Sequence, residues 1–215
     1  MFDNIDFYLV FDLFLLLLIG MGPKIALVPF LEATQGMEAE TQRKIANTMV
    51  RTAVGTALLL VVLGWLLMRL LHFTPGAANV AGGIVLLLIS LNMLVSPAKK
   101  HDPKAEAGHH DLQKMAIYPL AVPYLLNPAG IAALVIISDD IDSLLFGAIV
   151  IGVVLLVGLI DFAVFRNIDK LSKHLDPSRL VITEVIFGVL LTALAVQLMA
   201  DGLAQMGVIS ELVGY

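Results

Sequence analysis

FYLVFDLFLLLLIGMGPKIALVPFLEAT, residues 7–34, is long enough to cross a bilayer, for which an α-helix needs roughly 20 mostly apolar residues. Near its middle, the run Gly20-Met21-Gly22-Pro23 interrupts the apolar pattern. Proline removes a backbone donor and clashes with the preceding turn of a helix, so Pro23 kinks or breaks it. The stretch therefore predicts a membrane-spanning helix that is broken near its centre.

The rest of the chain has the composition of a protein with several such helices. Of its 215 residues, 59% are hydrophobic and 14% are charged, whereas a soluble domain is about half apolar and a quarter charged. One small core cannot bury this excess, so lipid must cover it. We predict an all-α polytopic membrane protein, a single domain over residues 1–215, with six spans near 7–34, 47–71, 78–96, 115–138, 143–166 and 180–206. An alternative count divides residues 115–142 differently, because Pro119, Pro123 and Pro128 interrupt them.

Lysine and arginine are concentrated on one side of the predicted topology. Eleven of the 13 lie in or beside the loops that follow spans one, three and five, whereas the opposite side has Arg69 alone and Lys24 lies inside span one. Cytoplasmic loops carry the excess of positive charge in membrane proteins. The bias therefore predicts that both termini lie outside the cytoplasmic (inner) membrane, with the longest basic loop, residues 97–114, in the cytoplasm.

The two halves of the chain match at a fixed offset of 105 residues. Each half, about 7–96 and about 115–206, holds three spans, and an odd number gives the second half the opposite orientation. The pattern predicts two inverted three-helix repeats in which helices 1 and 4 are broken at equivalent points, with chance matching as the alternative. The matches are Gly22-Pro23 with Asn127-Pro128, Gly83 with Gly188, and Asn92 with Gln197.

Interrupted helices at corresponding positions of two halves are typical of a transporter's substrate site. Freed backbone N–H and C=O groups cannot face lipid, so they require protein, water or a ligand. The N-terminus of a half-helix also presents free N–H groups and a partial positive charge, which suit a carboxylate. A kink that only shapes packing is the alternative. The candidate substrate-binding residues are Gly22, Pro23, Lys24, Asn92, Asn127, Pro128, Gly130 and Gln197.

Five short motifs are spaced along nearly the whole chain: Gly22-Pro23 with Phe30 to Met37, Ala81 to Ile84, Pro119 to Pro123, Asn127 to Ile131, and Gly188 with Gln197. Their order and spacing resemble the MarC family of six-span inner-membrane proteins, which is related to small neutral amino-acid transporters of the SnatA type. The first motif usually reads Asn-Pro in that family and reads Gly22-Pro23 here. The resemblance implies secondary transport of small neutral amino acids, with H⁺ or Na⁺ as candidate coupling ions.

Ionisable residues inside a span are functional candidates, because each costs at least ~2.5–3.5 kcal/mol at the helix centre. Lys24 directly follows the first break and could pair with Asp161 or Glu184, and snorkelling to the interface is the alternative. Asp161 and Glu184 lie close to span ends, which favours an interfacial position for each. Asp12 lies in the outer part of span one. Asp12, Asp161 and Glu184 are the candidates for coupling or gating.

Uncharged polar groups could bind the rest of a zwitterionic substrate. Carbonyl groups of unwound backbone and the amides of Asn127, Asn92 or Gln197 suit an ammonium group. The alternative is that Asn92, Gln197 and Ser90 only hydrogen-bond between helices. Small residues beside the breaks predict a pocket that admits small side chains; they are Ala26, Ala129, Gly130 and Ile131.

Other functions have weaker signals. Without cysteine there is no disulfide or thiolate metal site, and the histidines of the region His101–His110 lack the spacing of a closed metal site. No Ser-His-Asp set, phosphate loop or zinc motif predicts an enzyme or a cofactor, and no basic patch with interleaved aromatics predicts nucleic-acid binding. An ion or metal permeation protein would favour aligned acidic residues, which are scattered here. A membrane scaffold or regulator would have no use for paired helix breaks.

Overall fold

The computed structural model describes residues 7–95, 109–168 and 177–210, and these are mostly helical. No strand occurs within these ranges, so the predicted all-α class is confirmed for the described chain. The helices in chain order are α1 (Phe7–Met21), α2 (Pro23–Ala33), α3 (Ala39–Leu71), α4 (Pro75–Val95), α5 (His109–Met115), η1 (Ala116–Leu125), α6 (Pro128–Asp139), α7 (Leu144–Arg166) and α9 (Pro177–Gln205).

The described helices provide up to six membrane spans by length and apolar composition. Five come from α1 with α2, from α3, from α4, from α7 and from the second half of α9. The sixth is a bent pair, in which residues 112–125 meet α6 at an angle of 70°. The class of polytopic membrane protein is therefore confirmed, and the bent pair occupies the position of the predicted broken span four.

Two predicted boundaries differ from the structure. Helix α3 begins at Ala39 rather than near residue 47, because Ile45 is buried against the core while the opposite, exposed face is polar. That face carries the ion pair between Glu40 and Lys44, with 2.7 Å between its atoms. Helix α5 begins at His109, inside the predicted loop 97–114, whereas His101 lies outside the described residues.

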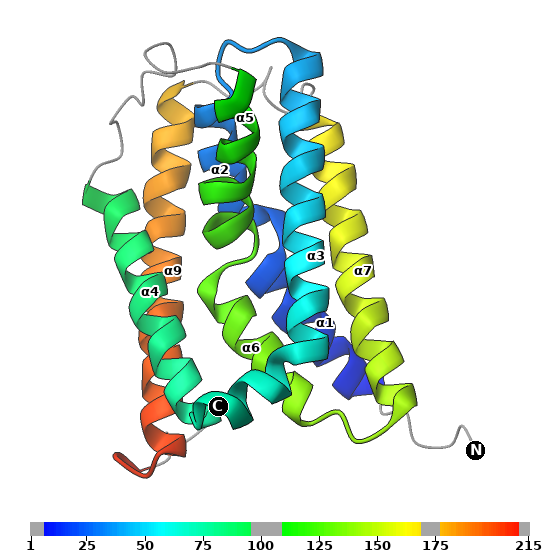
Figure 1. Ribbon diagram of the computed structural model, residues 1–215. Coiled ribbons are helices and arrows are strands. Elements are labelled where there is room, and N and C mark those ends of the chain that lie inside the picture. Colours follow the sequence, from blue (N-terminus) through cyan, green and yellow to red (C-terminus); the bar gives the residue numbers. More distant parts are fainter. Residues whose placement is uncertain (1–6, 96–108, 169–176, 211–215) are drawn as a thin grey trace.

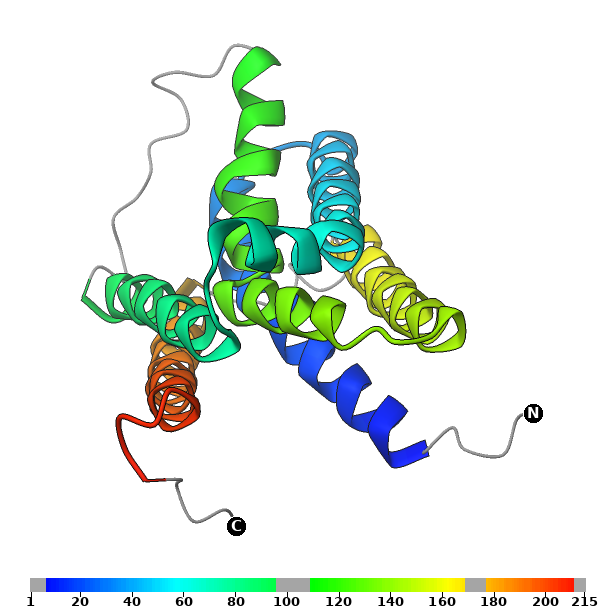
Figure 2. The ribbon, with the colours of Figure 1, turned by 60° about the horizontal axis from the view of Figure 1, so that its bottom comes forward.

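The spans form a bundle in which the two broken spans lie between two helix pairs. Figure 1 shows α4 and α9 side by side on one flank and α3 with α7 on the other. Between the flanks run α1–α2 and η1–α6, and α6 contacts α1, α3 and α4. Figure 2 shows the same arrangement nearly along the bundle. This layering places both breaks inside the protein rather than at the lipid.

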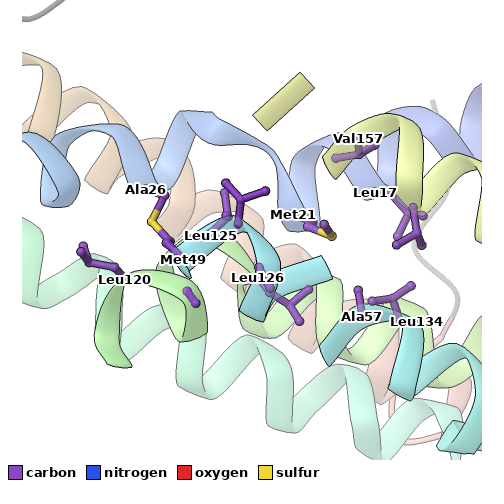
Figure 3. Packing of buried hydrophobic residues seen from close by; sticks show 14 of the residues in the cluster. Leu17, Met21, Ala26, Met49, Ala57, Leu120, Leu125, Leu126, Leu134 and Val157 are labelled. Atoms are coloured by element: carbon purple, nitrogen blue, oxygen red, sulfur yellow. The ribbon is translucent and has the colours of Figure 1, made fainter. Parts of the chain in front are cut away.

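The largest buried cluster surrounds the broken spans. Figure 3 shows how its side chains converge from α1, α2, α3, η1, α6 and α7. Many large apolar side chains on the outside of the bundle are exposed, which fits contact with lipid. The labelled members of the cluster are Leu17, Met21, Ala26, Met49, Ala57, Leu120, Leu125, Leu126, Leu134 and Val157.

The start of α1 and the end of α9 lie at one end of the bundle, opposite the turn between α2 and α3 (Figure 1). Given the positive charge of the loops at that opposite end, we expect both termini to face outward. Alkaline phosphatase fused after the last residue should be active in cells, and a fluorescent protein fused there should be dark. The same two reporters inserted in the loop 97–114 serve as the control, in which alkaline phosphatase should be inactive and the fluorescent protein bright. A bright C-terminal fluorescent fusion would contradict the predicted orientation.

Candidate functional site

The first span breaks between α1 and α2, at Gly22. Its backbone is extended, with φ −83° and ψ 166°. Pro23 occupies the first turn of α2, where its missing N–H group would have had no intrahelical partner. A Cβ atom at position 22 would collide with the carbonyl oxygen of Leu18, so this turn requires glycine. Gly22, at the N-cap position of α2, supplies no side-chain cap to this helix.

The second break has the same backbone conformation. Asn127 precedes α6 with φ −83° and ψ 166°, and Pro128 follows in the first turn. Here the helix is capped, because the Oδ1 atom of Asn127 accepts a hydrogen bond of 2.9 Å from the N–H group of Gly130. The two breaks thus share a local design and differ in one side chain. The relation of the two halves as inverted repeats stays a prediction.

The two breaks contact each other directly. The N–H group of Asn127 donates to the carbonyl oxygen of Gly20 at 2.9 Å, and its Nδ2 group donates to the carbonyl oxygen of Ile19 at 2.8 Å. A Cβ atom on Gly20 would lie 2.9 Å from the backbone nitrogen of Gly130, so the two backbones touch. The prediction that spans one and four are broken and approach each other is therefore confirmed.

Asn127 is 1% exposed, and both polar atoms of its amide are bonded to protein. The side chain acts as a clamp that joins the end of α1 to the start of α6. This structural role was not expected from the sequence, which pointed to contact with an ammonium group. A role of Asn127 in substrate binding stays a prediction.

The α4–α9 pair packs across the breaks from one side. A Cβ atom on Gly82 would lie 3.1 Å from the carbonyl oxygen of Pro128, so the small residue on α4 permits close approach to α6. A second apolar cluster joins these elements to α2 and consists of Ile25, Leu86, Ala129, Leu191 and Ala195. Met21 and Leu126, which border the two breaks, belong to the larger core (Figure 3).

Three of the predicted binding residues, Lys24, Asn92 and Gln197, are exposed. Lys24 is exposed at the start of α2, and Asn92 is exposed on α4. Gln197 is exposed on α9, where its Nε2 group donates to Asp201 at 2.8 Å. Both amides thus lie on the surface of the α4–α9 pair, whereas Asn127 is buried. Bonding between helices is instead supplied by Ser90, whose Oγ atom accepts a 2.9 Å hydrogen bond from Thr192 of α9.

The three candidates for coupling or gating have different environments. Asp12 is exposed on α1, and the side chain of Glu184 lies outside the described part of α9. Asp161 is 0% exposed, and among the described residues neither of its carboxylate oxygens has a hydrogen-bond partner. The side chain of Asp161 therefore lies on the buried face of α7, whereas its position at the membrane interface stays a prediction.

The fold and the paired breaks define an integral membrane protein with interrupted helices inside the bundle. The sequence pattern described as MarC family integral membrane protein matches residues 7–207. The chain belongs to the MarC family, as its motifs predicted.

Several relatives resemble the chain over most of its length. A UPF0056 membrane protein of Methanocaldococcus jannaschii is 27% identical, over 85% of this chain and 90% of that protein. The UPF0056 membrane protein YvbG of Bacillus subtilis is 25% identical, over 82% and 85%. The UPF0056 inner membrane protein YhgN of Escherichia coli is 24% identical, over 87% and 92%. No solved structure matches the chain.

Proposed function

We propose that this MarC-family protein is a secondary transporter that carries small neutral amino acids across the cytoplasmic membrane. Its substrate site is placed at the paired helix breaks. The observation that supports this most is the 2.9 Å hydrogen bond between Asn127 and Gly20, which joins two interrupted spans inside the bundle. Interrupted helices that meet in this way are where secondary transporters hold their substrates.

The N-terminus of α2 is the part of the site that suits the carboxylate of an amino acid. A helix N-terminus carries roughly half a positive charge and several free N–H groups. At α6 these groups are partly used by the side chain of Asn127, whereas the N-cap residue of α2, Gly22, supplies no side-chain cap. We therefore place the carboxylate at α2 rather than at α6.

Small residues around the breaks support a small substrate. Ala26, Ala129 and Gly130 are buried beside the two half-helices. A pocket bounded by such residues has no space for a long side chain unless the helices separate further. One extra methylene group changes binding by about 1–3 kcal/mol in an apolar pocket. Glycine, alanine and serine are therefore the expected substrates, and leucine should be transported far more slowly.

Transport requires the breaks to separate, since the backbones of Gly20 and Gly130 are in contact. The α4–α9 pair is suited to move as one unit, because Ser90 and Thr192 bond its two helices and glycines line its interface. A Cβ atom on Gly83 would lie 2.8 Å from the carbonyl oxygen of Ala195. We propose that this pair rocks against the broken spans and exposes the breaks to each side in turn, as in other alternating-access transporters.

Reconstituted protein provides the test of this proposal. Proteoliposomes loaded with unlabelled glycine should take up radiolabelled glycine, alanine and serine by exchange, because each fits the small pocket. Leucine should exchange at least tenfold more slowly, the effect of about 1.4 kcal/mol, and glutamate should not exchange. Vesicles without protein give the background. Monodisperse protein that exchanges none of these amino acids above background would overturn the proposed function.

A permeation pathway for metal ions has no comparable support. Such a pathway requires several oxygen or nitrogen ligands that converge on one point. Within residues 7–95, 109–168 and 177–210, no three acidic, histidine or cysteine side chains come together in this way. The same vesicles loaded with a divalent-cation dye should therefore show no protein-dependent signal.

A further inference from the structure

Asp161 is the single charged residue that is fully buried in the described part of the chain. Neither carboxylate oxygen has a hydrogen-bond partner among the described residues. An isolated ionised carboxylate in an apolar interior costs several kcal/mol even after the protein relaxes. A group retained at such a cost within a membrane span is a functional candidate. The question is what it binds there.

The position of Asp161 along α7 places it level with the first turns of α2. Gly158, Asp161 and Phe165 lie on one buried stripe of α7, as residues three and four apart do on a helix. A Cβ atom on Gly158 would lie 3.8 Å from the Cε atom of Met21. The ring centroid of Phe165 lies 5.1 Å from that of Phe30. Asp161 lies between these two positions on the stripe, at the level of the segment between Met21 and Phe30, which contains the first break.

The described helices that pack most extensively against α7 are α1, α2 and α3, and they offer Asp161 no charged partner. Their titratable side chains are exposed on the surface of the bundle, as is Arg166 of α7 itself. The same face of α7 is otherwise apolar, with Val154 and Val157 beside Gly158. The exposed groups on the three packed helices are Tyr8, Asp12, Lys24, Glu32, Glu40, Arg43, Lys44, Arg51 and Arg69.

This environment is suited to a proton rather than to a metal ion. Hard cations are held by about six oxygen ligands, whereas here one carboxyl group stands among apolar side chains. A proton requires only that single group, and the resulting neutral acid is far less costly to bury. The carboxyl group also lies five residues before the end of α7, about 8 Å along the helix axis. Water therefore has a short path to it when the bundle opens at that end.

We infer that Asp161 is the proton-binding group that couples substrate movement to the proton gradient. The coupled process, amino-acid movement across the membrane, is taken from the proposed function, and the inference rests on it in that respect. In one conformation the carboxylate takes a proton from water on one side, and as a neutral acid it is buried beside the first break. After the α4–α9 pair rocks, the acid releases the same proton to the other side. The O–H bond of the acid is the only bond that forms and breaks.

The first test separates proton coupling from exchange. The variant Asp161→Asn keeps the shape of the protonated acid and cannot release a proton. It should still exchange external radiolabelled glycine for the unlabelled glycine inside loaded vesicles, and it should lose the glycine accumulation that an imposed pH gradient drives. Asp142→Asn is the matched control, because Asp142 is exposed in the turn before α7, and it should accumulate glycine as wild type does. Glycine accumulation by Asp161→Asn at the wild-type level would overturn the inference and leave the transport function intact. The same conclusion would follow if the wild-type protein exchanged glycine but did not accumulate it in response to the pH gradient.

The second test does not depend on transport or on the folding of a variant. Dicyclohexylcarbodiimide modifies protonated carboxyl groups in apolar surroundings, and mass spectrometry locates the product. In the wild-type protein, Asp161 should be modified at neutral pH, and the modification should decline as the pH rises. This result would support a proton site at Asp161 even if no amino acid were exchanged, in which case the proposed amino-acid transport alone would fail. Absence of modification at every pH, or protection by Na⁺ at constant pH, would overturn the inference.

Discussion

Replacing Asn127 with alanine is expected to abolish amino-acid exchange in proteoliposomes while the protein stays inserted in the membrane. Alanine removes the acceptor for the N–H group of Gly130 and the donor to the carbonyl oxygen of Ile19. Each buried backbone group that loses its partner costs about 1–3 kcal/mol. These two bonds join α6 to the end of α1, so the breaks lose the geometry that forms the site. The apolar lengths of the spans are unchanged, so insertion persists.

Two further variants separate the functions of the Asn127 side chain. Asn127→Ser keeps an oxygen that caps α6 but is too short to bond Ile19, so it should restore stability more than exchange. Asn167→Ala removes an exposed side-chain amide that donates a hydrogen bond to the carbonyl oxygen of Ala163. This position is far from the breaks in the sequence, so the variant should exchange amino acids at a rate near that of wild type. Helical content and monodispersity are compared before each measurement. Exchange by Asn127→Ala at the wild-type rate would show that the clamp is not part of the transport site.

Local features of the sequence were enough to predict the helices and their breaks. Apolar length determines whether a segment can span a bilayer, and proline interrupts a helix through its own missing donor and ring. Neither effect requires knowledge of distant contacts. The breaks at Gly22 and Asn127 and the α3–α4 turn near Pro75 therefore follow directly from the residues. The start of α3 did not, because its first turns are amphipathic and polar rather than apolar.

The sequence did not predict in the same way which side chains point into the bundle and which lie on its surface. Helices that are apolar on all sides have no periodic signal that shows which face is inward. For this reason Asn92 and Gln197 were expected at the site and lie exposed, and the burial of Asp161 inside the bundle was not predicted. The partner of Asn127 is more than a hundred residues away, on α1. Its bond to Ile19 becomes visible only when the two spans are placed together.

The contact between Gly20 and Gly130 explains why one added methyl group should have a large effect on stability. A Cβ atom at position 130 would lie 2.9 Å from the Cα atom and 2.6 Å from the carbonyl carbon of Gly20. These are backbone atoms, so relief requires a shift of α1 or α6 as a whole. Overpacking of this kind costs typically about 1–3 kcal/mol, and a rigid neighbour favours the upper part of that range. Gly130→Ala is therefore expected to melt several degrees below wild type, at about 2–4 °C per kcal/mol.

Gly152 of α7 provides the matched control, since a Cβ atom there would have no atom within 4 Å among the described residues. Alanine inside a helix is more stable than glycine by roughly 0.5–1 kcal/mol when space permits, so Gly152→Ala should melt at or above the wild-type temperature. The same Gly→Ala substitution is thus expected to lower stability at position 130 and not at position 152, which excludes a general effect of added helix propensity. Thermal unfolding is followed in detergent by circular dichroism and size-exclusion chromatography.

A double variant that combines Gly20→Ala with Gly130→Ala tests the contact itself. It should lose less stability than the sum of the losses in the two single variants, because one displacement of α1 from α6 relieves both contacts. Strict additivity, or a Gly130→Ala protein as stable as wild type, would show that the two breaks do not touch.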